Sequence, residues 1–216
     1  MRKAITFAAA IAATGLTAAT ASAALIDDSA PFAFPLSPAT QTVALDQFDP
    51  ALGTLISVTI EIEGEVTADI TAENDSVLDA PGYQISLTAN FEAVAPGTSA
   101  VVALNDAWAQ ALVATDGVPG SGADFHDFGT LSDDNSNSNS IVSGLAPYIG
   151  TGTIDVDVNG SAGFSFSGTT DSSLDISNLA GEGEVTVIYN YIPIPEPASM
   201  ALLGLGGVAI LARRKK

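Results

Sequence analysis

The sequence predicts an all-β fold, a single antiparallel β-sandwich, flanked by an N-terminal signal helix and a C-terminal short transmembrane helix. Apolar and polar residues alternate along residues 56–63, 66–73 and 83–91, which is typical of strands with one buried and one solvated face. The alternation returns between residues 154 and 191, interrupted by Gly and Asn at intervals of about 8–12 residues, as in sandwiches. The chain has no cysteine, so the core must stabilise the domain without disulfides.

The first elements follow in chain order. Residues 24–40 are rich in proline and are expected to form a loose leader, before a domain that covers residues 41–191. Residues 56–73 are expected to form a β-hairpin that turns at Gly64, because two alternating runs flank this glycine. A further strand is expected at residues 83–91.

The middle of the domain gives a weaker pattern. Residues 101–114 are Ala-rich and compatible with a short helix, but the flanking strands favour two short strands here. Residues 119–122 and 133–140 are expected to be loops because of their Gly, Pro, Asp, Asn and Ser content. The predicted core consists of the apolar members of the alternating runs, among them Ile56, Val58, Ile60, Ile62, Ile85, Leu87, Val156, Phe164, Phe166 and Val187.

Charge is distributed very unevenly along the chain. All six basic residues lie at the two ends, and all 25 acidic residues lie between them, for a net charge of −19. A chain without basic residues in its central region cannot neutralise phosphates, so nucleic-acid binding and binding to anionic lipid surfaces are excluded for that region. Basic residues beside apolar stretches favour the cytoplasmic side of a membrane, so the pattern indicates export followed by a membrane stop.

The first 23 residues have the three parts of a cleaved signal peptide. Arg2 and Lys3 form the positive region, and residues 4–16 form the apolar region. The small residues Ala21 and Ala23 then suit signal peptidase, which predicts cleavage between Ala23 and Ala24. The partners implied are signal peptidase and the export machinery.

The C-terminal 25 residues, 192–216, also divide into three parts. A Pro-rich spacer with Pro195, Glu196 and Pro197 precedes an uncharged apolar run at residues 198–212. As a helix this run is about 22 Å long, shorter than the roughly 30 Å hydrocarbon core of a bilayer. The chain ends with a basic cluster that is expected to stop transfer on the cytoplasmic side, Arg213, Arg214, Lys215 and Lys216. These features favour a temporary anchor.

This tail resembles the PEP-CTERM sorting signal, which combines Pro-Glu-Pro, a short apolar helix and a terminal basic cluster. The sequence from Pro195 to Gly206, PEPASMALLGLG, is similar to the typical sequence of the family. The resemblance implies a Gram-negative bacterium that makes extracellular polysaccharide. It also implies an exosortase, a membrane protease-transpeptidase that recognises the Pro-Glu-Pro region and removes the tail.

The domain itself is similar to the choice-of-anchor E domain. The similarity lies in three segments, DQFDPALGTL at residues 46–55, YIGTGT at residues 148–153 and VTVIYNY at residues 185–191. Members of that family carry one of several alternative surface-anchoring tails, of which PEP-CTERM is one. The family has no assigned catalytic residues, so the resemblance implies none here.

A catalytic triad and a zinc site are both disfavoured by the sequence. His126 is the only histidine; Ser121 and Asp127 lie near it in sequence, but no nucleophile motif surrounds that serine. Zinc sites need clusters of Cys and His, which one His does not supply. We therefore expect no catalytic, cofactor-binding or metal residues, and no enzyme.

Calcium is the one cofactor with a partial sequence signal. Asp133, Asn135 and Asn137 have the spacing of the first EF-hand ligands, but Ser138 and Gly144 stand where that loop requires Gly and Glu. A solvated polar loop is the favoured interpretation. Paired glycosidase carboxylates are not indicated either, since the acids fall on exposed strand positions.

Three hypotheses for the function follow. The first is an exported noncatalytic surface or extracellular-matrix protein, sorted through an exosortase and associated with exopolysaccharide or biofilm. The second is a carbohydrate-binding module of the same matrix, with Tyr83, Trp108 and Tyr148 as candidate sugar platforms. The third, a secreted hydrolase, lacks site residues. In each, the chain is expected to be anchored transiently and then to reach the cell surface or the medium.

Overall fold

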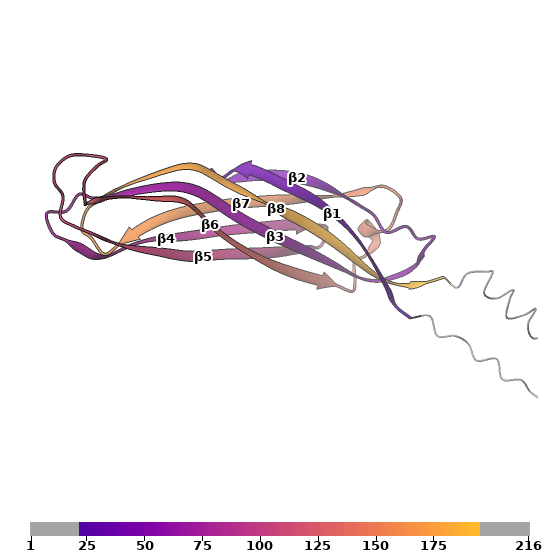
Figure 1. Ribbon diagram of the computed structural model, residues 1–216. Helices are drawn as coiled ribbons and strands as arrows, with labels where there is room; N and C mark the ends of the chain where they lie inside the picture. Colours follow the sequence, from indigo (N-terminus) through magenta and orange to yellow (C-terminus); the bar gives the residue numbers. More distant parts are fainter. Residues whose placement is uncertain (1–21, 195–216) are drawn as a thin grey trace, which may run out of the picture.

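A computed structural model describes residues 22–194, and they form an all-β domain (Figure 1). The predicted signal helix at residues 1–23 and the predicted membrane helix at residues 198–212 lie wholly or almost wholly outside the described residues. Within residues 22–194 no helix has the length and hydropathy that a bilayer crossing requires. The elements are β1 (Ala24–Pro35), β2 (Ala39–Asp46), β3 (Gly53–Asn74), β4 (Ala80–Ala95), β5 (Thr98–Leu112), β6 (Phe125–Ile141), the short 3-10 helix η1 (Ala146–Tyr148), β7 (Thr153–Ser167) and β8 (Ser172–Pro193).

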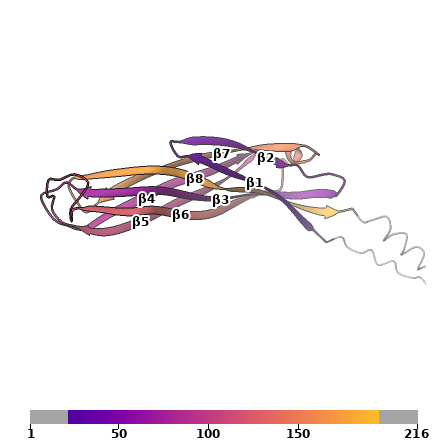
Figure 2. The same ribbon diagram turned by 45° about the horizontal axis from the view of Figure 1, so that its top comes forward.

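The strands form two four-stranded antiparallel sheets that pack face to face (Figures 1 and 2). One sheet has the order β1-β8-β3-β6 and the other the order β2-β7-β4-β5. The two 22-residue strands, β3 and β8, pair along most of their length and run from one end of the sandwich to the other. The predicted antiparallel sandwich is therefore confirmed in its architecture.

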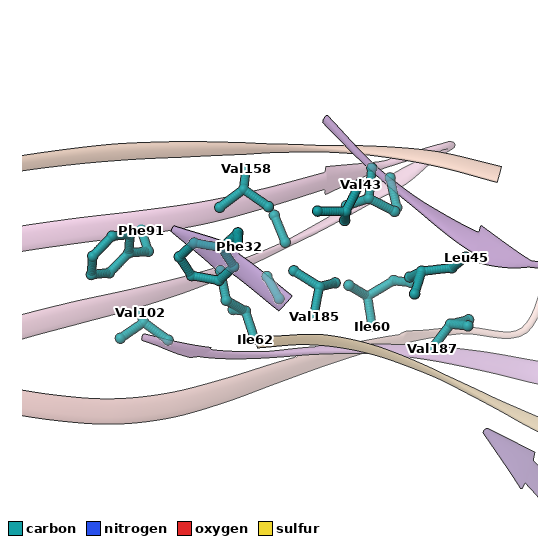
Figure 3. Packing of buried hydrophobic residues seen from close by; sticks show 14 of the residues in the cluster. Phe32, Val43, Leu45, Ile60, Ile62, Phe91, Val102, Val158, Val185 and Val187 are labelled. Carbon is teal, nitrogen blue, oxygen red and sulfur yellow. The ribbon is translucent and has the colours of Figure 1, made fainter. Parts of the chain in front are cut away.

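The core lies between the sheets and is built by residues of one parity on each strand (Figure 3). On β3, Val58, Ile60 and Ile62 are fully buried, and the residues between them face outward. Burying one Val or Ile side chain stabilises a fold by about 1.5–3 kcal/mol, so the cluster supplies the stability that disulfides cannot. Of the predicted core, Val58, Ile60, Ile62, Ile85, Leu87, Val156 and Val187 are buried and Phe164 is half-buried.

Two predicted core residues are exposed instead. The ladder between β3 and β8 shifts register between Leu55 and Ser57, so Ile56 falls on a bulge and points outward with 37% of its surface exposed. A bulge inserts one residue and reverses the inside-outside parity beyond it. Phe166 lies near the end of β7, where it stacks on the buried Tyr83 with 39% of its own surface exposed.

The predicted hairpin at residues 56–73 is wrong, because these residues form the single strand β3. Gly64 is buried in the middle of this strand rather than at a turn. A β-carbon placed on Gly64 would lie 2.6 Å from Cδ2 of Phe91. The glycine is present because the aromatic ring of the opposite sheet occupies the space of its side chain.

Three further predictions need correction. The expected leader is part of the fold, since residues 24–35 form β1 and pair with β8, and residues 39–46 form β2. The segment at residues 101–114 belongs mainly to one strand, β5, and is neither a helix nor two strands. The expected polar loop at residues 133–140 lies within β6, which pairs with β3 over its whole length.

Candidate functional site

Both ends of the described chain leave the sandwich at the same place (Figure 1). Ala24, at the start of β1, pairs with Tyr191 near the end of β8. The backbone N–H of Ile194 then donates to the carbonyl of Leu52 over 3.1 Å, which fixes the last described residue to the loop before β3. The N-terminal and C-terminal segments therefore begin side by side.

The predicted processing residues lie at or beyond this end. Ala23 is exposed, and Ala24 is the half-buried first residue of β1. The other predicted residues lie outside residues 22–194, namely Ala21, Pro195, Glu196, Pro197, Arg213, Arg214, Lys215 and Lys216. The structure thus places their attachment points but not the residues themselves.

Exposed apolar side chains surround the two attachment points. Leu25 is 69% exposed, Ile192 is 45% exposed and Ile194 is 58% exposed, and Ile26 and Leu52 are exposed beside them. We call these five residues the apolar rim. A concentration of large exposed apolar residues is unusual for solvated surface and often marks a contact region.

Carboxylates gather on the same sheet, on its solvated face. Glu63 lies directly opposite Glu184 across the β3–β8 ladder, and Glu65 lies opposite both Glu182 on β8 and Asp134 on β6. These five residues, the acidic patch, help to line a shallow depression of about 840 Å³. With no basic residue in the chain between Lys3 and Arg213, this surface repels polyanions.

At the opposite end of the sandwich, Asn74 ties three loops together. Its Nδ2 donates to the carbonyls of Leu78 and Val113 over 2.9 and 2.6 Å. Its Oδ1 accepts from the backbone N–H of Ser76 and from the hydroxyl of Thr169. Because Asn74 is fully buried and both of its side-chain polar atoms have two hydrogen-bond partners, it holds these loops together. Nothing in the sequence distinguished Asn74 from its polar neighbours.

The aromatic platforms predicted for sugar binding are mostly unavailable. Tyr83 and Tyr148 are fully buried, and their hydroxyls bond Ser172 and the carbonyl of Pro96. Burial raises the pKa of Tyr148 to about 12 and raises that of Tyr83 as well. Only Trp108, half-buried on β5 against the core, retains an accessible face.

His126 does not form a triad with its neighbours in sequence. It lies on β6, and its ring packs edge-on against Phe128 with the centroids 4.7 Å apart. The hydroxyl of Ser121 is oriented toward the carbonyl of Val118 at 3.5 Å, and Asp127 accepts a backbone N–H from Gly129. The structure therefore brings no nucleophile and base together at this histidine.

Two of the three residues with partial EF-hand spacing, Asn135 and Asn137, have a structural role. Asn135, Asn137 and Asn139 alternate along β6 and donate to the carbonyls of Ala103, Val101 and Ser99 on β5, over 3.3, 2.7 and 3.0 Å. We call this row the Asn ladder; it joins the edges of the two sheets. Nearby, burial and the charge of Asp106 raise the pKa of Asp133. Among the described residues, no three His, Asp or Glu side chains are arranged to hold a metal ion together.

The comparisons with known proteins identify the C-terminal tail. Residues 193–216 match the PEP-CTERM protein-sorting motif, and the match starts at Pro193, the last residue of β8. The motif implies an exported protein that is anchored through its C-terminus, is processed by an exosortase and reaches the cell surface or the extracellular space. No curated protein matches the chain.

Among solved structures, chains from virus particles show remote similarity. A chain in the structure of the infectious bursal disease virus Gx strain is 15% identical, covers 90% of this chain and 48% of the viral one, and has a TM-score of 0.19. For the Gt strain the values are 13%, 82%, 43% and 0.13. This chain spans about half the length of those viral chains. TM-scores this low do not indicate a shared fold.

Proposed function

We propose that this protein is a noncatalytic component of the cell surface or extracellular matrix, sorted by an exosortase and associated with extracellular polysaccharide in a biofilm. The observation that carries the proposal is the position of the sorting motif, which begins where β8 ends. The fold between the two processed termini would then be the delivered cargo, a domain resembling choice-of-anchor E.

The geometry at the termini suits a short attachment. Ile194 is held by its hydrogen bond to Leu52, and the α-carbons of residues 194 and 198 can lie at most roughly 14 Å apart in a fully extended chain. While the tail is attached, the apolar rim is therefore held near the membrane surface, where Leu25 and Ile192 lose contact with bulk water. Removal of the tail would release the domain from this position.

Intact-mass analysis of the surface-released protein tests the sorting step. In a host with an active exosortase we expect a carboxy terminus near Glu196 and an amino terminus at Ala24. Replacing Pro195 and Pro197 by Ala should leave full-length, membrane-bound chains that still carry Lys216. The matched control is Pro119→Ala, in an exposed loop, which should be processed normally. Release of the double variant with a trimmed tail would overturn the sorting proposal.

The proposal of a noncatalytic role rests on the surroundings of His126, whose ring packs edge-on against Phe128 while the hydroxyl of Ser121 is directed toward the carbonyl of Val118. The matrix association is tested by fractionating cells into membrane, matrix and medium before and after enzymatic removal of polysaccharide. We expect the processed domain to leave the matrix fraction with the polysaccharide. Retention on cells stripped of polysaccharide would contradict this part of the proposal.

The carbohydrate-binding alternative now depends on one side chain. Trp108 is the only tryptophan of the chain, so fluorescence excited selectively at tryptophan reports on it alone. A spectral shift on titration with matrix oligosaccharides, lost in Trp108→Leu, would support a sugar platform. An unchanged spectrum would favour the noncatalytic structural role without this binding face.

A further inference from the structure

The loop between β5 and β6, residues 113–124, holds a carboxylate away from water. It lies at the end of the sandwich opposite the termini (Figure 1). Asp124 is fully buried. Its Oδ2 accepts the backbone N–H of Asp116 over 2.8 Å, but its Oδ1 is buried without any hydrogen-bond partner. Buried carboxylate oxygens are otherwise nearly always paired.

A second carboxylate oxygen converges on the same place. A β-carbon built on Gly122 would lie 2.5 Å from Oδ2 of Asp116 and 2.6 Å from Oδ1 of Asp124. The two oxygens are therefore no more than about 5 Å apart, a span that one Ca²⁺ can bridge with bonds of about 2.3–2.6 Å. Gly122 has φ +101°, so the backbone here requires glycine, and any side chain at this position would overlap with both oxygens.

Residues 22–194 contain no Lys or Arg that could compensate these groups. No Lys or Arg occurs between Lys3 and Arg213. Glu73, 7% exposed at the base of the same loop, adds a further carboxylate, which accepts the N–H of Gly120 over 2.8 Å. A buried ionised carboxylate is costly unless a cation or enough donors compensate it. The unpaired Oδ1 of Asp124 therefore points to a cation that comes from solution.

We infer that this loop is a calcium site in which Asp116 and Asp124 supply the carboxylate ligands. Calcium suits a set made only of oxygen atoms and accepts backbone carbonyls and water for the rest of its six to eight ligands. Zinc favours nitrogen and sulfur ligands, and magnesium requires a near-ideal octahedron. With two carboxylates, the affinity belongs to the range of extracellular modules, a Kd of about 10⁻⁴–10⁻³ M.

This site is separate from the segment with partial EF-hand spacing. Asn135 and Asn137 donate to β5, so their side chains serve the contact between the two sheets. The inferred site instead closes the β5–β6 loop, which also contacts Asn74 through the carbonyls of Val113 and Asp124. Calcium would therefore fix the loop cluster that faces away from the membrane attachment.

The test uses the full chain in detergent after treatment with chelator. Calcium titration by calorimetry and thermal melting is compared with magnesium and with sodium chloride at matched ionic strength. We expect a calcium-specific rise in melting temperature that saturates in the millimolar range. Asp116→Asn and Asp124→Asn should each weaken calcium binding at least tenfold, while the matched control Asp155→Asn, an exposed carboxylate on β7, should retain it.

A second readout distinguishes a lost site from a damaged fold. In chelator, Asp124→Asn should melt at or above the temperature of the parent chain, because the substitution removes an uncompensated buried charge. In calcium the order should reverse. The inference fails if the parent shows no calcium effect beyond ionic strength, or if Asp155→Asn loses the effect to the same extent. It also fails if Asp124→Asn melts below the parent by the same amount in chelator and in calcium.

Discussion

The ring of Phe91 on β4 fills the space that a side chain on Gly64 of β3 would occupy. Its Cδ2 atom lies 2.6 Å from the position of a β-carbon on Gly64, and its Cε1 and Cζ atoms lie 2.7 Å from the corresponding position on Gly181 of β8. Phe91 is fully buried and packs against Phe32 and Phe34 with centroids 5.7 and 6.3 Å away. The absence of side chains at the two glycines thus makes room for the ring of Phe91 and the aromatic cluster around it.

Replacing Gly64 by Ala should therefore destabilise the domain. The added methyl group would overlap with the ring of Phe91, because the two lie closer than van der Waals contact, and such overpacking costs about 1–3 kcal/mol. Urea denaturation measures the change in free energy of unfolding. The matched control is Gly163→Ala on β7, where a β-carbon meets nothing within 4 Å and the change should be close to neutral or stabilising.

A double-mutant cycle assigns the cost to this contact. Phe91→Leu should destabilise the parent chain more than it destabilises the Gly64→Ala variant, because the smaller side chain relieves the overlap. Equal effects in the two backgrounds would show that Gly64 is required for another reason.

The same glycine explains where sequence reasoning succeeded and where it failed. Alternation placed Val58, Ile60 and Ile62 in the core correctly, and Gly64 keeps their parity, so the buried face continues through it. We predicted a turn because glycine interrupts apolar runs in hairpins as well as in strands. The bulge that turns Ile56 outward follows from the pairing of β3 with β8, which the local sequence does not contain.

The Asn ladder leads to a second prediction. Replacing Asn135 and Asn137 together by Ala removes two bonds between β6 and β5, each with a net stabilising effect of about 0.5–1.5 kcal/mol. We expect lower stability and faster hydrogen exchange of amides in both strands. Freed edges are templates for pairing with other chains, so the variant should also self-associate more readily in sedimentation measurements.

The control for the double replacement of Asn135 and Asn137 is a double replacement of the two serines that alternate with them. Ser136 and Ser138 occupy the alternate positions of β6, and replacing both by Ala should change neither exchange nor association. Similar behaviour of the two double variants would refute the role of the amide side chains.

Composition did not allow either the polar strand β6 or the inferred calcium site to be predicted. Asn135, Asn137 and Asn139 have a period of two, but polar residues in a row are typical of loops, and an alternation without apolar residues does not distinguish a strand from a loop. Asp116 and Asp124 are brought together only by the folded loop around Gly122, so spacing could not identify them. The sorting motif was predictable because it is contiguous in sequence.

The buried hydroxyl of Tyr148 leads to a prediction about the stability of the domain at alkaline pH. Burial raises the pKa of its hydroxyl to about 12, whereas a tyrosine in an unfolded chain ionises near 10. Between these values the folded state binds more protons than the unfolded state, so stability falls as pH rises from about 10 toward 12. Melting temperatures across that range measure the slope, and Tyr148→Phe should make it shallower.

Comparing slopes avoids an ambiguity in the variant. Tyr148→Phe also loses the hydrogen bond to the carbonyl of Pro96. This loss lowers the free energy of unfolding at neutral pH as well as at pH 10, so it shifts the melting temperature without changing its slope with pH. Burial likewise raises the pKa values of Tyr189 and Tyr83, so part of the slope should persist. An unchanged slope would mean that Tyr148 ionises alike in the folded and unfolded states.

The acidic patch gives the last prediction. Glu65 on β3 lies between two other carboxylates, Glu182 and Asp134, and like charges placed directly opposite each other on a sheet are destabilising. Glu65→Lys should convert two repulsive pairs into attractive ones, each contributing about 0.2–1 kcal/mol. The gain should be larger in 0.02 M than in 0.5 M sodium chloride, because salt screens charges on this exposed face. The parent chain, at a net charge of −19, should itself melt higher as sodium chloride rises.

The control is Glu92→Lys, which changes the net charge by the same amount as Glu65→Lys. Glu92 lies opposite Val101 and Asn159, so this variant should gain less stability. An equal gain in both variants would attribute the effect to net charge rather than to the cross-strand pairs.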